Sequence, residues 1–151
     1  MSESDEKDSR AKICKRMSES TKQWKIIIDS LTTKLRGDIK FAIDIQAEAI
    51  SHRQSVVEEV KDYSVKIYKL VQKMKVLTKA RFEFYATSYQ VKTSGSEKLK
   101  LIDSDLSEYQ VFIDELDEHV NFLRDTSKNL EAINYSVKNK IEVANILGGY
   151  K

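Results

Sequence analysis

A short stretch in the second half of the chain places two cations beside three aromatic rings. It reads Lys79-Ala80-Arg81-Phe82-Glu83-Phe84-Tyr85. Lysine and arginine pair with phosphates or carboxylates, and aromatic rings stack on bases. Arg81 also falls inside an apolar stripe of the sequence, where a buried charge would need a partner. The segment therefore predicts binding to a polyanion or to an acidic partner surface.

The residues before this segment are strongly basic. Residues 61–81 contain seven cations and one acid, whereas residues 103–131 contain nine acids and two cations, although the whole chain has a net charge of only +2. On a helix the lysines fall into two groups. The first group shares one face and the second lies roughly opposite: Lys66, Lys69 and Lys73, then Lys75 and Lys79.

Two interpretations fit the basic segment. A solvated face that balances the acidic residues is one of them. Contact with a single-stranded nucleic acid is the other, because cations that track phosphates and rings that stack on bases hold such strands. Phe82 lies off the apolar stripe and is the better candidate for an exposed ring. Tyr85 could stack on a base as well, but Phe84 and Tyr85 also fit the stripe as core residues.

Residues for catalysis or metal binding form no recognisable set. His52 and His119 lie on different predicted helices, with no ligands at suitable spacing around them. No phosphate-binding GxxxxGK[ST] loop occurs. The carboxylates of residues 114–118 are interpreted as a solvated acidic face rather than as an acid–base pair. We expect no enzymatic activity, no metal and no cofactor.

The composition favours long helices. The 151 residues include no proline and four glycines, and 33% are charged while 40% are hydrophobic. The sequence therefore contains few residues that would interrupt a helix. Cys14 is the only cysteine, so an intramolecular disulfide is impossible and a cytoplasmic location is expected. No apolar run reaches the ~20 residues that a membrane span needs, and no membrane partner is expected.

The start of the chain is expected to be a mobile tail, residues 1–18, followed by a single domain, residues 19–151. Ser20 could cap a short first helix. The apolar face of this helix would include Trp24 and Leu31. Gly37 could end that helix in a left-handed conformation, and Asp38 could cap the next one.

Two long helices should follow. Apolar residues from Ile39 to Tyr85 form a stripe with a period of about 3.5, as in a coiled coil. Residues 91–96 are expected to form a loop, and a last helix should start near Asp103 or Asp105. The predicted fold is all-α: a long antiparallel helical hairpin with a short N-terminal helix. Because such a hairpin has little core, its remaining apolar surface should drive self-association.

Two parts of the sequence resemble the UvsY family of phage recombination mediator proteins. Residues 79–85 are similar to that family's Lys-Ala-Arg motif, which is followed by an apolar residue, an acid and two aromatics. A second similarity begins at Asp103-Ser104-Asp105 and runs to Gly148, through Ile113, Phe122, Ile133 and Ile141. Together they cover about two-thirds of the chain.

The resemblance implies a non-enzymatic protein of an infected bacterial cytoplasm that binds single-stranded DNA during recombination and DNA repair. It implies a ring-shaped homo-oligomer, a heptamer in the family, that loads a strand-exchange recombinase onto DNA covered by single-strand DNA-binding protein. The family's DNA-binding positions correspond to Lys79 and Arg81. The family's oligomerisation helix corresponds to Leu130, Ile133, Val137, Ile141, Ala144 and Leu147.

This sequence departs from the family in two places. The loop after Tyr85 is shorter and lacks a glycine-rich start, and residues 1–16 look like an extension. Other functions also fit long helices with a lopsided charge. A structural coiled-coil scaffold or a module that binds anionic membranes is one alternative. A helical subunit whose basic and acidic faces only pair with each other is another.

Overall fold

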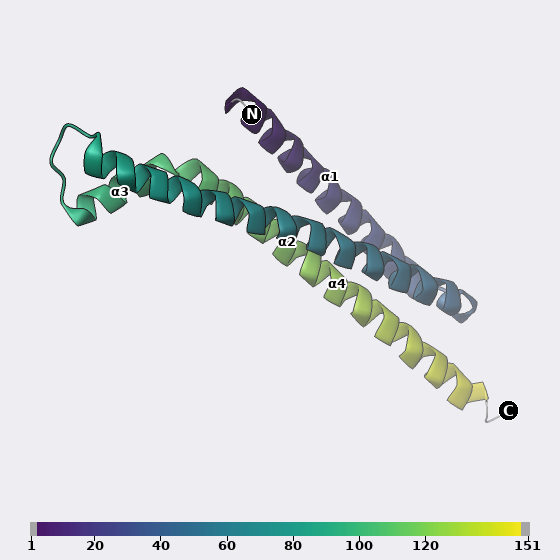
Figure 1. Cartoon of the computed structure of the whole chain (residues 1–151). Helices are drawn as coiled ribbons and strands as arrows, with labels where there is room; N and C mark the ends of the chain where they lie inside the picture. Colours follow the sequence, from purple (N-terminus) through teal and green to yellow (C-terminus); the bar gives the residue numbers. More distant parts are fainter. Residues whose placement is uncertain (1–2, 149–151) are drawn as a thin grey trace. The chain divides into compact units, whose positions relative to one another are not determined.

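The computed structural model describes residues 3–148, which contain helices and connecting loops but no strand (Figure 1). The all-α prediction is therefore confirmed for these residues. The helices are α1 (Glu3–Leu35), the short 3-10 helix η1 (Ile39–Phe41), α2 (Ala42–Thr87), α3 (Gly95–Asp105) and α4 (Ser107–Gly148). The chain divides into two compact units, and α2 and α4 contribute to both. Unit 1 comprises Met1–Lys61 with His119–Lys151, and unit 2 comprises Asp62–Glu118.

Unit 1 is a bundle of three helices. Polar contacts fix their directions: Lys34–Glu48 at 2.9 Å, Trp24–Glu59 at 3.1 Å, Thr21–His119 at 3.5 Å, Arg53–Glu131 at 3.6 Å and Lys140 to the Leu35 carbonyl at 2.9 Å. They show that α2 runs antiparallel to α1, whereas α4 runs parallel to α1. Apolar residues from all three helices fill the centre: Met17, Trp24, Leu31, Ala42, Ile45, Ala49, Val56, Val120, Leu123, Leu130, Ile133 and Val137.

Helix α1 is much longer than expected. It begins at Glu3, so the predicted boundary between a tail and a short helix near residue 19 is wrong. The stretch contains no proline or glycine, and acidic residues occupy the first turn, where they favour the positive end of the helix dipole. Met17 supplies one further buried contact, seven residues before Trp24. Residues 1–2 of the predicted tail lie outside the described part.

The turn after α1 was predicted in part. Asp38 caps η1, because its side chain accepts a hydrogen bond from the Lys40 amide. Gly37 follows the helix, but no glycine of residues 3–148 adopts a positive φ. A Cβ at Gly37 would lie 3.2 Å from the Lys34 carbonyl oxygen, so close packing explains the glycine better. Ser20 is not a cap, since it lies inside α1 and donates to Glu59 at 2.7 Å.

Unit 2 contains the end of α2, the helix α3 and the start of α4. Helix α3 was not predicted from the sequence, although Ser94 and Glu97 form a capping box at its start. The last helix starts at Ser107, slightly later than expected. The centre of this unit is a cluster of three buried residues, Tyr85, Ile102 and Leu106. Four partly buried residues pack against this cluster: Met74, Leu77, Leu101 and Tyr109. The C-terminal end of α2 thus packs against α3.

Candidate nucleic-acid interface

The basic segment of α2, defined as residues 66–81, contains six cations and no acid. Lys69, Lys75 and Lys79 are exposed, and none of them forms an ion pair with a carboxylate of residues 3–148. Because the segment is a continuous helix rising about 1.5 Å per residue, Lys69 and Lys79 are separated by roughly 15 Å along the axis. Three solvated ammonium groups are therefore available to an anion.

The other two lysines of the segment are half-buried against rings. The Lys66 ammonium lies 5.5 Å from the centre of the Tyr63 ring, and that of Lys73 lies 5.3 Å from the Tyr109 ring. Such cation–π contacts fix a side chain without neutralising its charge. Lys66 thus adds positive potential to the segment, whereas Lys73 is engaged by other groups of the chain as well.

Arg81 is engaged within the chain. Its Nε atom lies 3.7 Å from Oδ2 of Asp105, and the same oxygen accepts a hydrogen bond of 2.7 Å from the Tyr85 hydroxyl. This hydrogen bond to a carboxylate raises the pKa of Tyr85 above its ordinary value. The arginine side chain is still 49% exposed. Arg81 therefore lies outside the dry core and has a carboxylate partner, Asp105, that was not predicted from the sequence.

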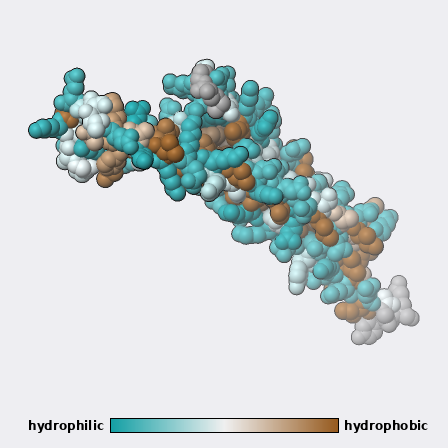
Figure 2. Space-filling model, viewed as in Figure 1, coloured by the Kyte–Doolittle hydropathy of each residue, from teal (hydrophilic) through white to brown (hydrophobic). Residues whose placement is uncertain are grey.

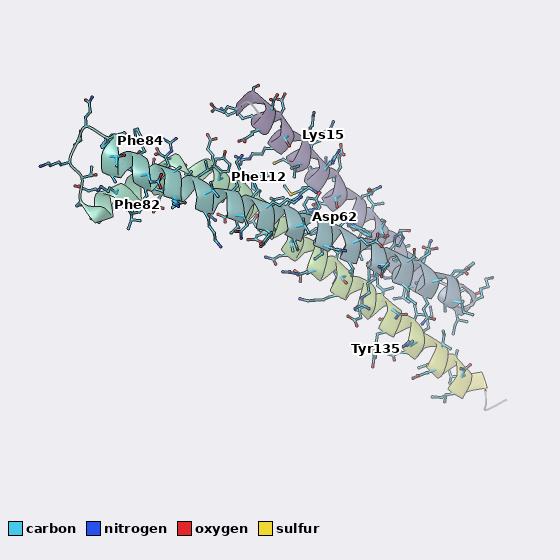
Figure 3. All side chains as sticks on the ribbon, in the orientation of Figure 1. Lys15, Asp62, Phe82, Phe84, Phe112 and Tyr135 are labelled. Atoms are coloured by element: carbon cyan, nitrogen blue, oxygen red, sulfur yellow. The ribbon has the colours of Figure 1, made fainter. Side chains whose placement is uncertain are left out.

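The aromatic residues that follow the basic segment separate into exposed and buried rings. Phe82 is 42% exposed, as expected, and Phe84 is 41% exposed although it was placed on the core stripe (Figure 3). Tyr85 is only 8% exposed, and its ring packs edge-on against Tyr89 at 5.0 Å. Tyr85 is consequently a core residue in this structure, which does not support its predicted role as a stacking ring.

A further exposed ring, Tyr68, was missed. It is 65% exposed, and Lys75 follows it by seven residues on the same face of α2. Val76 is 69% exposed. Viewed along the helix axis, it lies between Lys69 and Lys75. The sequence itself indicates that Tyr68 is exposed, because this residue falls outside the apolar stripe that contains Ile67 and Leu70.

The exposed lysines of the basic segment, Lys69, Lys75 and Lys79, form no ion pair with the acidic residues of unit 2 in the described chain. Asp114 accepts a hydrogen bond from Gln110 at 2.8 Å, and Asp117 and Glu118 are exposed. Apart from Arg81–Asp105, no exposed cation of residues 66–81 has a carboxylate within 4 Å in the described chain. The interpretation in which the two charged faces only neutralise each other is therefore weakened.

The residues predicted for oligomerisation lie in unit 1 and differ strongly in burial. Leu130, Ile133 and Val137 are buried in the core of the bundle. Ile141 and Ala144 are half-buried, and only Leu147 is exposed, at 66%. Three of the six predicted contacts are thus used by the chain itself, because α4 packs against α1 and α2 along this face.

Two negative observations hold for residues 3–148. No group of three or more His, Cys, Asp or Glu side chains is arranged to hold a metal ion, and no helix is long and apolar enough to cross a membrane. The chain matches no protein-family model, no curated protein and no solved structure.

Proposed function

We propose that this protein is a non-enzymatic recombination mediator that binds single-stranded DNA through the basic segment of α2. The observation that carries the proposal is the set of three exposed lysines, Lys69, Lys75 and Lys79, without carboxylate partners in the described chain. Their ammonium groups pair with phosphates, which supplies most of the affinity for a single strand. The resemblance to UvsY proteins supports single-stranded DNA as the polyanion.

The exposed rings give the interface its preference for unpaired bases. Tyr68 lies on the basic segment and Phe82 directly follows it, and each ring has more than two-fifths of its surface exposed. Stacking on aromatic rings requires bases that are free of a duplex, and it tolerates any sequence. Single strands should therefore bind more tightly than duplex DNA of the same length.

Arg81 contributes a contact that depends on Asp105. A guanidinium has five N–H donors, and the ion pair at 3.7 Å occupies the Nε side of the group. The remaining donors can reach a phosphate, while Asp105 opposes the approach of that negative charge. Arg81 is thus a weaker phosphate ligand than its position in the family motif suggests.

Mediation requires several copies to act together. By resemblance, the copies form a ring that loads a strand-exchange recombinase onto DNA covered by single-strand DNA-binding protein. A strand that engages one basic segment meets the next at high effective concentration, so weak sites combine into strong binding. Release of individual segments then exposes DNA to the incoming recombinase.

The test is the salt dependence of binding to a single-stranded oligonucleotide. The logarithm of the binding constant should fall with the logarithm of salt concentration by about 0.7 for each phosphate contact. Lys79→Ala should reduce this slope by about one contact, and Lys75→Ala should do the same. Lys22→Ala is a matched control, because Lys22 is an exposed lysine of α1 in unit 1. Affinity that is insensitive to salt would refute the proposal.

Anionic membranes are the competing partner, and one observation favours them. Tyr68 and Val76 are exposed among the lysines, as in helices whose apolar side chains enter a headgroup layer. Vesicles with phosphatidylserine separate the two functions. Strong co-sedimentation with these vesicles, together with no binding of single-stranded DNA at low salt, would favour the membrane.

A further inference from the structure

The outward face of α2 in unit 2 carries four side chains in a nearly straight line: Tyr68, Lys75, Lys79 and Phe82. We call them the ring–lysine row. Because each residue turns an α-helix by about 100°, all four lie within an arc of about 60° around the axis. Along the axis, Lys75, Lys79 and Phe82 lie roughly 10.5, 16.5 and 21 Å beyond Tyr68. The row therefore presents a ring, two cations and a second ring, in that order.

The side chains of the row are open to solvent. Tyr68 is 65% exposed, Phe82 is 42% exposed, and both lysines are exposed as well. In the described chain neither ring contacts another ring or makes a hydrogen bond, and neither lysine forms an ion pair. Phe84 differs, because its ring packs on Tyr85 at 5.2 Å and on Tyr89 at 6.2 Å. Tyr68 and Phe82 are thus the rings that a ligand can stack on without displacing a neighbour.

One acidic residue limits the row at its C-terminal end. Glu83 follows Phe82 directly, is exposed, and forms no ion pair with Lys79 in the described chain. It lies one turn beyond Lys79 and about 40° from it around the axis. Its charge opposes a phosphate placed beyond Lys79, whereas it does not oppose an uncharged base on Phe82. The part of the row that suits phosphates therefore ends at Lys79.

The order of the side chains distinguishes between kinds of anionic ligand. In a helix that lies on a membrane, apolar side chains form one face and cations occupy the opposite, polar face. Here Lys75 and Lys79 lie between the two rings, so burying both rings in a headgroup layer would draw both ammonium groups in with them. On the face of unit 2 that Figure 2 shows, hydrophilic and hydrophobic side chains are likewise interspersed. A single strand matches this alternation, because it offers phosphates and bases along one line.

We propose that a single strand of DNA lies parallel to the axis of α2, with two of its bases stacked on Tyr68 and Phe82 and the phosphates between them held by Lys75 and Lys79. This inference rests on the proposed function and adds the path and the length of the bound strand. Stacked nucleotides advance about 3.4 Å each along a strand, so roughly six nucleotides join the two rings. The bases between the two stacked ones make no contact with the row and stay open to pairing.

Hexanucleotides with bases at chosen positions test this spacing. The first strand is hexathymidine, the second has thymine only at its two ends, and the third has thymine only at its two central positions, with abasic sites elsewhere. All three carry the same phosphates, so their ionic contacts are equal. The end-thymine strand should bind about as tightly as hexathymidine. The central-thymine strand should bind about fivefold or more weakly, because two adjacent bases reach only one ring. Fluorescence anisotropy at low salt measures the three affinities.

Ring variants test which residues contact the two end bases. Tyr68→Leu and Phe82→Leu keep an apolar side chain but remove the stacking surface, and both positions are exposed, so helical circular dichroism should be unchanged. Each variant should bind the end-thymine strand about fivefold or more weakly and lose its preference for it over the central-thymine strand. Lys75→Ala should weaken all three strands by the same factor. Tyr135→Leu is the matched control, since Tyr135 is 66% exposed on α4 in unit 1 (Figure 3), and it should leave all three affinities unchanged.

Two results would overturn the proposed path. They are equal affinities for the end-thymine and central-thymine strands, and leucine variants that bind the end-thymine strand as tightly as the unmodified chain does. If those leucine variants also bind phosphatidylserine vesicles as the unmodified chain does, the row belongs to a membrane surface instead. Salt-dependent binding without any preference among the strands contradicts the path alone, whereas binding that is insensitive to salt refutes the proposed function together with the path.

Discussion

At the scale of single residues, Arg81 is shared between two roles. Its ion pair with Asp105 helps to join α2 to α3, and the hydrogen bond from Tyr85 to the same carboxylate strengthens that junction. A phosphate bound at Arg81 competes with Asp105 for the guanidinium. The structure thus gives one residue of the candidate interface a structural function inside the chain.

Asp105→Asn tests this competition. Without the carboxylate charge, Arg81 should bind phosphate more readily, which should increase the affinity for single-stranded DNA and steepen its salt dependence by about 0.7. The fold should lose about 1 kcal/mol, because the Tyr85 hydroxyl exchanges a charged acceptor for a neutral one. Affinity is measured by fluorescence anisotropy and stability by urea unfolding.

Asp103→Asn provides the matched control for general charge effects. Asp103 is exposed on the same helix, and no ion pair involves it in the described chain. Equal gains in affinity from both variants would mean that Arg81 is not restrained by Asp105 in particular.

His119 links the stability of unit 1 to pH. It is 6% exposed, and burial lowers its pKa below the ordinary 6.5, while Glu59 opposes this shift more weakly. Its Nδ1 lies 3.5 Å from the Thr21 hydroxyl of α1, and its ring stacks on Phe122 at 6.0 Å. The neutral imidazole is therefore the form that fits the folded bundle.

The free energy of unfolding should fall as the pH drops below 6.5. In that range the unfolded chain binds a proton at His119 that the folded chain excludes, so protonation favours unfolding until the lowered pKa is reached. Urea midpoints between pH 7.5 and 5 measure this effect. His119→Leu should flatten the profile in this range, whereas His52→Gln should leave the contribution of His119 in place. A profile that stays unchanged in His119→Leu would contradict the assignment.

At the scale of elements, α3 depends on its first turn. The Ser94 side chain accepts from the Glu97 amide, and the Glu97 carboxylate accepts from the Ser94 amide at 2.7 Å, which lowers the pKa of Glu97. Ser94→Ala should destabilise unit 2 by about 1 kcal/mol, since one end of the capping box is lost. Ser104→Ala, an exposed serine inside the same helix, should have little effect. Hydrogen exchange of α3 amides would report the difference.

Local sequence patterns predicted some elements well and could not resolve others. Trp24 and Leu31 were placed correctly on the inner face of α1, because their seven-residue spacing reports a helical face directly. The start of α1 was predicted too late, because Ile13 and Met17 are sparse apolar residues among charges and serines, and only Met17 of the two is buried. The Ser94-to-Glu97 capping box was a readable local signal that was overlooked.

Helix α2 shows a limit of periodicity. The rows that contain Ala49 and Ile50 repeat with the same period and differ by one position, so the sequence joins them into one stripe. Which row is buried depends on how α1 and α4 pack, and in two of the three pairs of neighbouring residues (42–43, 49–50 and 56–57) the smaller one is buried. The pairing of Arg81 with Asp105 is similarly non-local and depends on the turn that brings α3 back to α2.

At the scale of the whole molecule, assembly should affect DNA binding through the number of basic segments that one strand can reach. If several copies associate as the proposed function requires, an oligonucleotide long enough to reach several basic segments gains affinity from their effective concentration. Affinity for the assembled chain should therefore rise steeply with oligonucleotide length, by a factor of about 100 or more. Titrations over a series of thymidine oligonucleotides measure this curve, and an affinity that stays flat across all lengths would mean that each copy binds DNA independently.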